Sequence, residues 1–140
     1  MIVKIVQDDR VDVLDVIRRS AYATDPKAER SLSSYILSST EVWVGYADDE
    51  VACVCGLIAP TILSDRAYLW LITTSLVDEH TFLFVRHSQM WMKQLRKRYA
   101  LITGDVDKHN ERAQQWLRWL GADLGWPLPD GKIPFQIRAA

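Results

Sequence analysis

The segment from Asn110 to Gly121 has the clearest helical pattern in the sequence. Its apolar side chains recur at the i, i+3, i+4 spacing that forms one stripe of a helix. They are Ala113, Trp116, Leu117 and Leu120. Gly121 follows at the point where a helix end favours a left-handed residue. The pattern therefore predicts a helix that buries one face and ends at Gly121.

A short apolar run, residues 100–106, precedes this helix and has the length of a strand. Strand and helix together form one β-α unit. Their junction carries Asp105, Asp107, His109 and Asn110. Because ligand sites in open α/β sheets favour such junctions, this segment is the first candidate site.

The other elements follow from the same periodicities. Apolar runs predict strands over residues 2–6, 41–47, 51–59, 66–74, 122–128 and 132–138, with turns at residues 48–49 and 129–131. Helical spacing predicts a helix capped by Asp8 or Asp9, a second helix over residues 27–37, and a long helix after residues 75–79. The inward stripe of the long helix consists of Phe84, Val85, Ser88, Trp91, Met92, Leu95 and Tyr99.

These elements occur in the order β-α-α-β-β-β-α-β-α-β-β. The order predicts the α/β (α+β) class, with a mixed, mostly antiparallel sheet of about six or seven strands and about four helices. A chain of 140 residues is long enough to bury a core by itself. We therefore expect a single domain over residues 1–140.

Composition narrows the classes of function. The hydrophobic fraction of 49% and the charged fraction of 25% are typical of globular proteins. No apolar run approaches the roughly 18 residues of a membrane helix, and the start of the chain lacks the features of a signal peptide. A net charge of -1 argues against general nucleic-acid binding, because such domains carry excess Lys and Arg. We expect neither a membrane nor a nucleic acid as partner.

The cysteines and histidines predict no metal site. Cys53 and Cys55 lie two residues apart within a predicted strand, a spacing that fits neither zinc sites nor disulfide frameworks. We expect both to be reduced core residues. His80 and His87 stand near acidic residues but complete no four-ligand set.

The helix that ends at Gly121 resembles the last conserved helix of the GNAT superfamily of acyl-CoA N-acyltransferases. The resemblance rests on the pattern N-x-x-A-x-x-[L/W]-x-x-x-L-G, present here as Asn110, Ala113, Trp116, Leu120 and Gly121. It implies that the strand before this helix separates from its neighbour to admit the acetyl-pantetheine arm. The helix N-terminus would then lie beside the thioester. The predicted order of elements is also that of the GNAT fold.

The segment that would bind the cofactor departs from the GNAT pattern. The family holds the CoA pyrophosphate with a glycine-rich loop, Q/R-x-x-G-x-G/A, before the long helix. Residues 73–81 stand there without a glycine, and Asp78 and Glu79 would face the anion with like charge. We interpret this pair as first-turn residues of the long helix, where acids suit the helix dipole. The departure predicts that no cofactor is bound in the usual manner.

The residues that would carry GNAT chemistry are also replaced. Leu117 stands seven residues after Asn110, where many family members have the tyrosine that protonates the thiolate. The predicted strand over residues 68–74 contains no Asp, Glu or His to act as the base. Asp105, Asp107 and His109 could form an acid-base group, but we interpret Asp107 as the helix cap and the others as exposed turn residues. The sequence thus predicts no catalytic residue.

Most of the chain is also similar to a narrower group, the small GNAT-like internal virion proteins of short-tailed bacteriophages. This similarity rests on residues 70–75, 97–99, 120–122 and 130–131. It implies a non-catalytic virion-associated or assembly protein, located in the virion or the host cytoplasm, whose partners are other phage virion or assembly proteins. Any of the six tryptophans that lie on the surface would be good anchors for such a partner.

Two other functions stay open. The first is an acetyl-CoA-dependent N-acetyltransferase with an atypical cofactor loop. The GNAT resemblance implies that Ile72, Thr73 and Thr74 would then align the pantetheine and that Asn110 would lie near the thioester, with a bound water as the base. The second is a phage effector that binds and inhibits a host protein.

Overall fold

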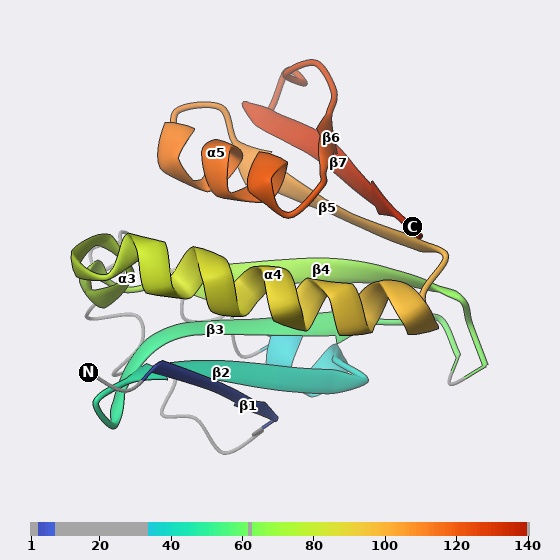
Figure 1. Ribbon diagram of the computed structural model, residues 1–140. Helices are drawn as coiled ribbons and strands as arrows, with labels where there is room; N and C mark the ends of the chain where they lie inside the picture. The colour runs from blue at the N-terminus through green and yellow to red at the C-terminus, as the bar shows by residue number, and fades with distance from the viewer. Residues whose placement is uncertain (1–2, 8–33, 62, 140) are drawn as a thin grey trace.

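The computed structural model describes residues 3–7, 34–61 and 63–139, which contain one mixed sheet of seven strands (Figure 1). The strands are β1 (Val3–Gln7), β2 (Glu41–Ala47), β3 (Glu50–Ile58), β4 (Arg66–Thr73), β5 (Leu101–Asp107), β6 (Asp123–Leu124) and β7 (Lys132–Arg138). They lie in the order β1-β2-β3-β4-β5-β7-β6, and each described pair is antiparallel except β4 with β5. The helices are α3 (Ser75–Glu79), α4 (Thr81–Arg98) and α5 (Glu111–Trp119). The predicted α+β class and mostly antiparallel sheet are confirmed.

Part of the predicted N-terminal region lies outside the described residues. This holds for the helix capped by Asp8 or Asp9 and for the start of the helix expected over residues 27–37. Residues 34–38 are helical, in agreement with the predicted end of that second helix. β1 ends at Gln7, one residue beyond the end of the strand expected over residues 2–6.

β2 and β3 form the hairpin that the alternating pattern predicts. Asp48 and Asp49, which connect the two strands, have φ angles of 48° and 70°. Two consecutive residues with positive φ are typical of the type I′ turn, whose twist matches that of the flanking strands. The turn pairs Ala47 with Glu50 and Tyr46 with Val51, and a β-bulge between Gly45 and Tyr46 then shifts the register of the rest of the hairpin by one residue.

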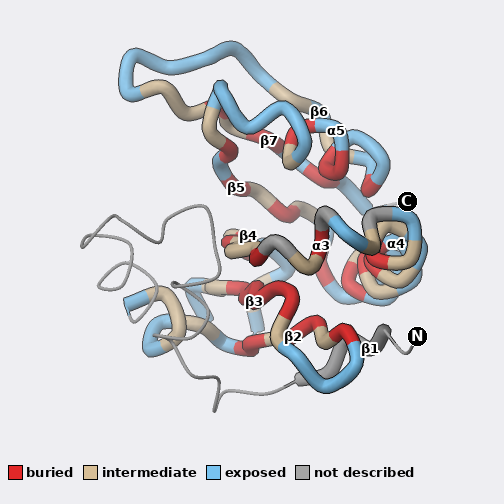
Figure 2. Tube along the Cα trace, turned by 90° about the vertical axis from the view of Figure 1, so that its left-hand side faces the viewer, coloured by how far each residue is buried: buried red, intermediate tan, exposed pale blue. Residues whose placement is uncertain are grey.

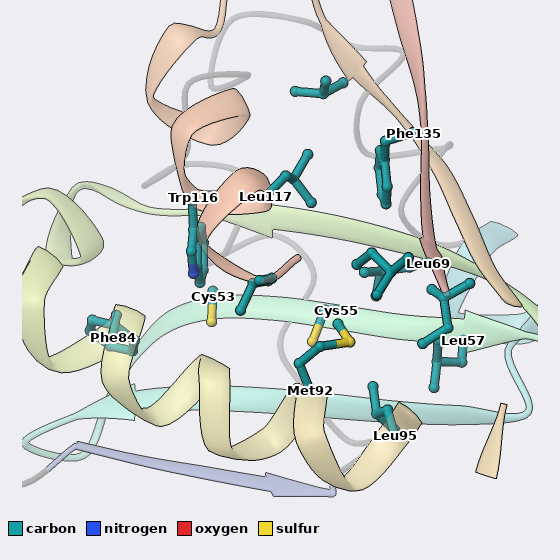
Figure 3. Packing of buried hydrophobic residues seen from close by; sticks show 14 of the residues in the cluster. Cys53, Cys55, Leu57, Leu69, Phe84, Met92, Leu95, Trp116, Leu117 and Phe135 are labelled. Atoms are coloured by element: carbon teal, nitrogen blue, oxygen red, sulfur yellow. The ribbon is translucent and has the colours of Figure 1, made fainter. Parts of the chain in front are cut away.

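α4 covers one face of the sheet with the stripe that its sequence predicts (Figure 3). Phe84, Met92 and Leu95 are at most 1% exposed. They pack in one cluster with side chains of β3, including Cys55 and Leu57. Burial of this apolar stripe anchors the helix on the sheet. None of the described helices combines the length and the apolar character that a membrane crossing requires.

A buried carboxylate joins the C-terminal end of α4 to β2. Glu41 is 8% exposed, and its Oε1 lies 2.7 Å from Nη2 of Arg98. Arg98 Nη1 donates to the second oxygen at 3.0 Å, and the Trp43 indole N–H donates to Oε1 at 2.8 Å. Because a buried carboxylate is tolerated only when it is paired, this bidentate contact orients α4 relative to the sheet.

The opposite face of the sheet carries a smaller apolar cluster. It consists of Val42, Val54 and Trp70, with Tyr35 and Ile36 packed against it. Tyr35 stacks on Trp70 with ring centroids 5.6 Å apart and an interplanar angle of 14°. The Trp70 indole N–H donates to Ser39 Oγ at 2.7 Å. These contacts hold the helical residues 34–38 against the sheet.

The predicted strand over residues 122–128 is too long, because β6 comprises only Asp123 and Leu124. Pro127 and Pro129 have no backbone N–H and cannot continue the ladder. The Gly125 N–H still donates to the Pro134 carbonyl at 2.8 Å. Beyond this bond the chain leaves β7 and forms a loop.

Candidate functional site

β4 and β5 are neighbouring strands that separate toward their C-terminal ends (Figure 1). Their parallel pairing joins residues 66–68 with residues 101–103. β4 continues to Thr73 and β5 to Asp107 beyond this pairing. The separation predicted for the strand before α5 is therefore observed. It lies at the carboxyl ends of parallel strands, where ligands bind in open α/β sheets.

Gly104 stands where the pairing of the two strands ends. A Cβ atom at this position would lie 2.6 Å from the Leu69 carbonyl oxygen and would overlap the Phe135 ring. Glycine thus allows β5 to approach the backbone of β4 closely at this level. The close approach marks the narrow end of the opening between the strands.

The backbone of β4 presents alternate residues to this opening. The Thr74 N–H donates to the Ala52 carbonyl at 2.8 Å. Because hydrogen-bonded pairs alternate in an antiparallel ladder, the groups of Ile72 also face β3, whereas those of Thr73 face the opening. Of the three residues predicted to align a pantetheine, only Thr73 could offer its backbone N–H. Cofactor binding by these residues stays a prediction.

A cavity of about 100 Å³ occupies the space between the separated strands, α4 and α5. Its walls are mainly apolar and include Cys53, Cys55, Leu69, Leu71, Trp91, Ala113, Trp116, Leu117 and Phe135, and Figure 3 shows several of these side chains. Asp105, Asp107, Asn110 and Lys132 contribute to its polar side. Ligand pockets typically enclose about 300–1,000 Å³, so this cavity holds a group of only a few atoms.

Two side chains of α5 limit the cavity. Leu117 is 6% exposed and occupies the position of the proton-donating tyrosine of the GNAT pattern, so it supplies no proton. Trp116 is 8% exposed and lines both the cavity and a wider groove outside it. The indole N–H groups of Trp116 and Trp91 have no hydrogen-bond partner among the described residues.

An open groove of about 670 Å³ separates α5 from α3 and the start of α4. Its lining includes Val77, Phe84 and Val85 on one side and Asn110, Arg112, Trp116 and Trp119 on the other. His109 and Glu111 also line it, so the charges along the groove are mixed. Asn110 and Trp116 belong to both the groove and the cavity, which makes the two spaces neighbours.

Our interpretation of Asp78 and Glu79 as first-turn residues of the long helix is wrong. Residues 75–79 form the separate helix α3, and α4 begins at Thr81 without an acidic residue in its first turn. Asp78 and Glu79 therefore occupy the last two positions of α3 and not the first turn of α4. The N–H of His80 donates to the Val77 carbonyl at 3.2 Å and is thus used within the segment.

The N-terminus of α5 also differs from the prediction. Asn110, not Asp107, caps the helix, because its Oδ1 accepts the Ala113 N–H at 3.0 Å. Asp107 Oδ1 instead accepts the His109 N–H at 2.8 Å, and its Oδ2 lies 4.0 Å from Lys132 Nζ. Asn110 remains at the mouth of the cavity, as the GNAT resemblance implies, but its side-chain oxygen is already engaged.

A hydrogen bond across the two separated strands was not apparent from the sequence. The Tyr68 hydroxyl donates to Asp105 Oδ2 at 3.2 Å. Burial, the neighbouring Tyr35 phenol and the Asp105 carboxylate, in that order, raise the pKa of Tyr68 well above its usual value. The phenol is therefore protonated at neutral pH and held by the carboxylate. Only the pairing of β4 with β5 brings these residues together, because they are 37 positions apart.

The cysteines that line the cavity are unsuited to nucleophilic chemistry. Cys53 and Cys55 are free and buried, as predicted. Burial raises the pKa of Cys53 from 9.0 to about 12 and also raises that of Cys55. Since the thiolate is the nucleophile, both residues are inert at neutral pH. The described residues contain no group of three or more His, Cys, Asp or Glu side chains that could hold a metal ion.

The rate of thiol labelling measures how far burial suppresses the reactivity of Cys53 and Cys55. At pH 8 the thiolate fraction of Cys53 falls about 1,000-fold when its pKa rises from 9.0 to about 12. We expect a disulfide reagent to modify the folded protein at least about 100-fold more slowly than the protein in denaturant. The rate should rise with pH up to about 12. Rapid labelling of both thiols at pH 8 without denaturant would contradict their burial.

Solved structures similar to this chain include several acetyltransferases. The ribosomal-protein-S18-alanine N-acetyltransferase from Escherichia coli has 16% sequence identity and a TM-score of 0.73, over 99% of this chain and 95% of that chain. A protein from Desulfovibrio desulfuricans assigned to the GNAT family has 14% identity and a TM-score of 0.72, over 99% and 100%. The chain has the GNAT fold. A Bacillus subtilis acetyltransferase in complex with CoA shares this fold with 11% identity and a TM-score of 0.70, over 99% and 100%.

The similarity to GNAT proteins is found by comparing structures and not by comparing sequences. No model of a protein family matches the sequence, and no curated protein matches it. The α5 pattern and the order of elements resemble the GNAT family, and the fold that this resemblance implies is confirmed. The GNAT resemblance implies that an acetyl-pantetheine arm would enter the opening between β4 and β5 and that its thioester would lie beside the N-terminus of α5.

Proposed function

We propose that this chain is a non-catalytic protein on a GNAT fold that acts through protein-protein contacts, as a virion-associated or assembly component of a bacteriophage. The observation that carries the proposal is α3. This helix occupies residues 75–79, where GNAT enzymes have a glycine-rich loop for the CoA pyrophosphate. It ends at Glu79, whose negative charge opposes an anion.

The cavity between the separated strands, α4 and α5 supports the same proposal. Its volume of about 100 Å³ is small for a pantetheine arm and a thioester together. Leu117 offers no proton, and the pKa of the Cys53 thiol is too high for a nucleophile. Tyr68 could donate a proton, but Asp105 already accepts its hydrogen bond. A GNAT reaction needs both an acid and a base near the thioester.

The assignment to a bacteriophage rests on the sequence similarity to the GNAT-like internal virion proteins, above all internal virion protein A of short-tailed bacteriophages. Residues 70–75, 97–99, 120–122 and 130–131 carry that similarity. Exposed aromatic side chains support a role in protein contacts, because Trp119 is 47% exposed and Trp126 is 88% exposed.

Calorimetry with acetyl-CoA tests the loss of the cofactor site. We expect no saturable heat at acetyl-CoA concentrations up to about 1 mM, which places any Kd above the micromolar range typical of substrates. A GNAT enzyme with an intact glycine-rich loop, titrated in the same buffer, is the positive control. A specific complex of micromolar affinity would remove the non-catalytic proposal.

Particle composition tests the second half of the proposal. We expect the chain to co-purify with mature particles at a constant copy number through two orthogonal purification steps. A tagged unrelated protein expressed at the same level controls for carry-over. Absence of the chain from particles and from assembly intermediates would contradict the virion role and would leave the GNAT fold unaffected.

An N-acetyltransferase is the second candidate, and the separated strands favour it. β4 and β5 diverge as the pantetheine site requires, and the groove beside α5 continues from the cavity through Asn110 and Trp116. One similar acetyltransferase was solved in complex with CoA. Release of free thiol from acetyl-CoA in the presence of a panel of amines would establish this activity. No release above buffer, with the positive control active, would exclude it.

A further inference from the structure

The loop between β6 and β7 exposes an apolar segment. Residues 125–131 project beyond the sheet (Figure 1), and Figure 2 shows the segment as largely exposed. Trp126 is 88% exposed and Leu128 is 47% exposed. Tryptophan is rarely left in water at this level, and such side chains are the commonest anchors of protein interfaces.

Hydrogen bonds close the base of this loop. The Gly125 N–H donates to the Pro134 carbonyl at 2.8 Å, and the Leu128 N–H donates to the Lys132 carbonyl at 2.8 Å. The Gly131 N–H donates back to the Leu128 carbonyl at 2.9 Å, which forms a tight turn around Pro129. Less conformational entropy is therefore lost when a partner binds the loop.

The two prolines decide how the loop can be recognised. Pro127 and Pro129 each fix φ near the polyproline II value, and each restricts the residue before it to extended conformations. Residues 126–129 are thus biased to an extended, polyproline-like segment. Neither proline has an N–H, and that of Leu128 is used inside the loop, so strand addition to a partner sheet is disfavoured. Recognition must depend on side chains.

The lack of charged side chains in this loop indicates which class of partner it can bind. Residues 124–129 read L-G-W-P-L-P and carry no charge. Nucleic acids and anionic membrane surfaces are bound largely through Lys and Arg, which this segment lacks. Uncharged extended segments with proline are instead bound by grooves lined with aromatic side chains. A protein groove of this kind is the occupant that matches the exposed chemistry.

We infer that residues 126–129 dock into an aromatic-lined groove of a partner protein, with Trp126 as the anchor in an apolar pocket. This inference rests on the proposed role in protein contacts and names the surface that performs it. The partner groove should provide a hydrogen-bond acceptor for the indole N–H and flat rings against Pro127 and Leu128.

Site-specific photo-crosslinking in the full chain identifies the partner. A benzophenone amino acid replaces Leu128, which leaves Trp126 intact, and the same replacement of Phe82 on α4 is the control because that residue is 76% exposed. We expect position 128, but not position 82, to crosslink to one protein, at a site that mass spectrometry maps to aromatic residues. Crosslinks from position 128 only to lipid or to a second copy of this chain would overturn the inference.

Calorimetry with the identified partner, purified, measures the anchor. We expect Trp126→Ala to weaken the Kd by about 30-fold or more, Trp126→Phe to retain part of the affinity, and Phe82→Ala to change it less than about twofold. Because Trp126 is exposed, its removal should leave Tm within about 2 °C. An unchanged Kd for Trp126→Ala would overturn the inference.

The two proposals fail separately. If the wild-type chain is found in particles and Trp126→Ala is retained equally, the docking loop is wrong and the virion role stands. If the wild-type chain is absent from particles but position 128 crosslinks to an aromatic groove of a host protein, the virion role is wrong and the docking loop stands.

Discussion

Gly104→Ala is expected to lower the free energy of unfolding by about 3 kcal/mol, as overpacking of a tight site does. A Cβ at this position would lie 2.6 Å from the Leu69 carbonyl oxygen and would overlap the Phe135 ring. The ring could shift, but the carbonyl belongs to the backbone of β4. The strands must therefore separate further at the narrow end of the opening. Urea unfolding followed by tryptophan fluorescence measures the change.

Gly125→Ala is the matched control for this substitution. A Cβ there would meet the side chain of Pro134 at 3.3 Å and its carbonyl oxygen at 3.4 Å, contacts that a small shift relieves. We expect a cost below about 1 kcal/mol. If Gly104→Ala proved no more destabilising than this control, β4 and β5 would not approach each other as closely as the structure shows.

Trp116→Ala is expected to destabilise the protein by about 3 kcal/mol, at the lower end of the range for large aromatic side chains in a core. Trp116 is 8% exposed and lies between the cavity and the outer groove. Its removal deletes apolar contacts and joins the two spaces. Its indole N–H has no partner among the described residues, so truncation also recovers part of a desolvation cost. Denaturant unfolding provides the measurement.

Trp119→Ala on the same helix controls for the general effect of removing an indole. Trp119 is 47% exposed, and we expect a loss of no more than about 1 kcal/mol. Comparable losses for the two variants would show that Trp116 does not separate the cavity from the groove. The Trp116→Ala variant also tests the enzyme alternative, because acetyl-CoA binding that appears only in this variant would identify the indole as the obstacle.

Local patterns in the sequence were sufficient to predict most elements in this fold. The stripe of α4 identifies the helix and its buried face, and the alternation expected over residues 41–47 and the apolar run over residues 51–59 identify β2 and β3 as strands. Neither strand shows a simple alternation of buried and exposed residues, because residues 52–57 of β3 are all buried. Gly121 has a φ of 94°, as the predicted left-handed residue after α5 requires. Boundaries were less accurate where two local preferences compete. α3 separates from α4 at His80, and prolines end β6 after Leu124.

The candidate site could be predicted only in outline. The absence of a glycine loop and of the motif tyrosine is a property of single positions, which the sequence displays directly. The helix cap could not be assigned in this way, because Asp107 and Asn110 are both good capping residues. Backbone geometry decided it, since the Asn110 oxygen is the one that meets the Ala113 N–H.

The sequence by itself determined most of the described strands and helices, their order and the replacement of the usual glycine-rich loop, and the α5 pattern carried the resemblance to the GNAT family. These properties depend on side chains close together in the chain. The tertiary structure alone decided that Tyr68 bonds Asp105, that Trp116 divides cavity from groove, and that Trp126 remains in water. Each of these depends on how distant segments meet, and periodicity carries no information on such distances.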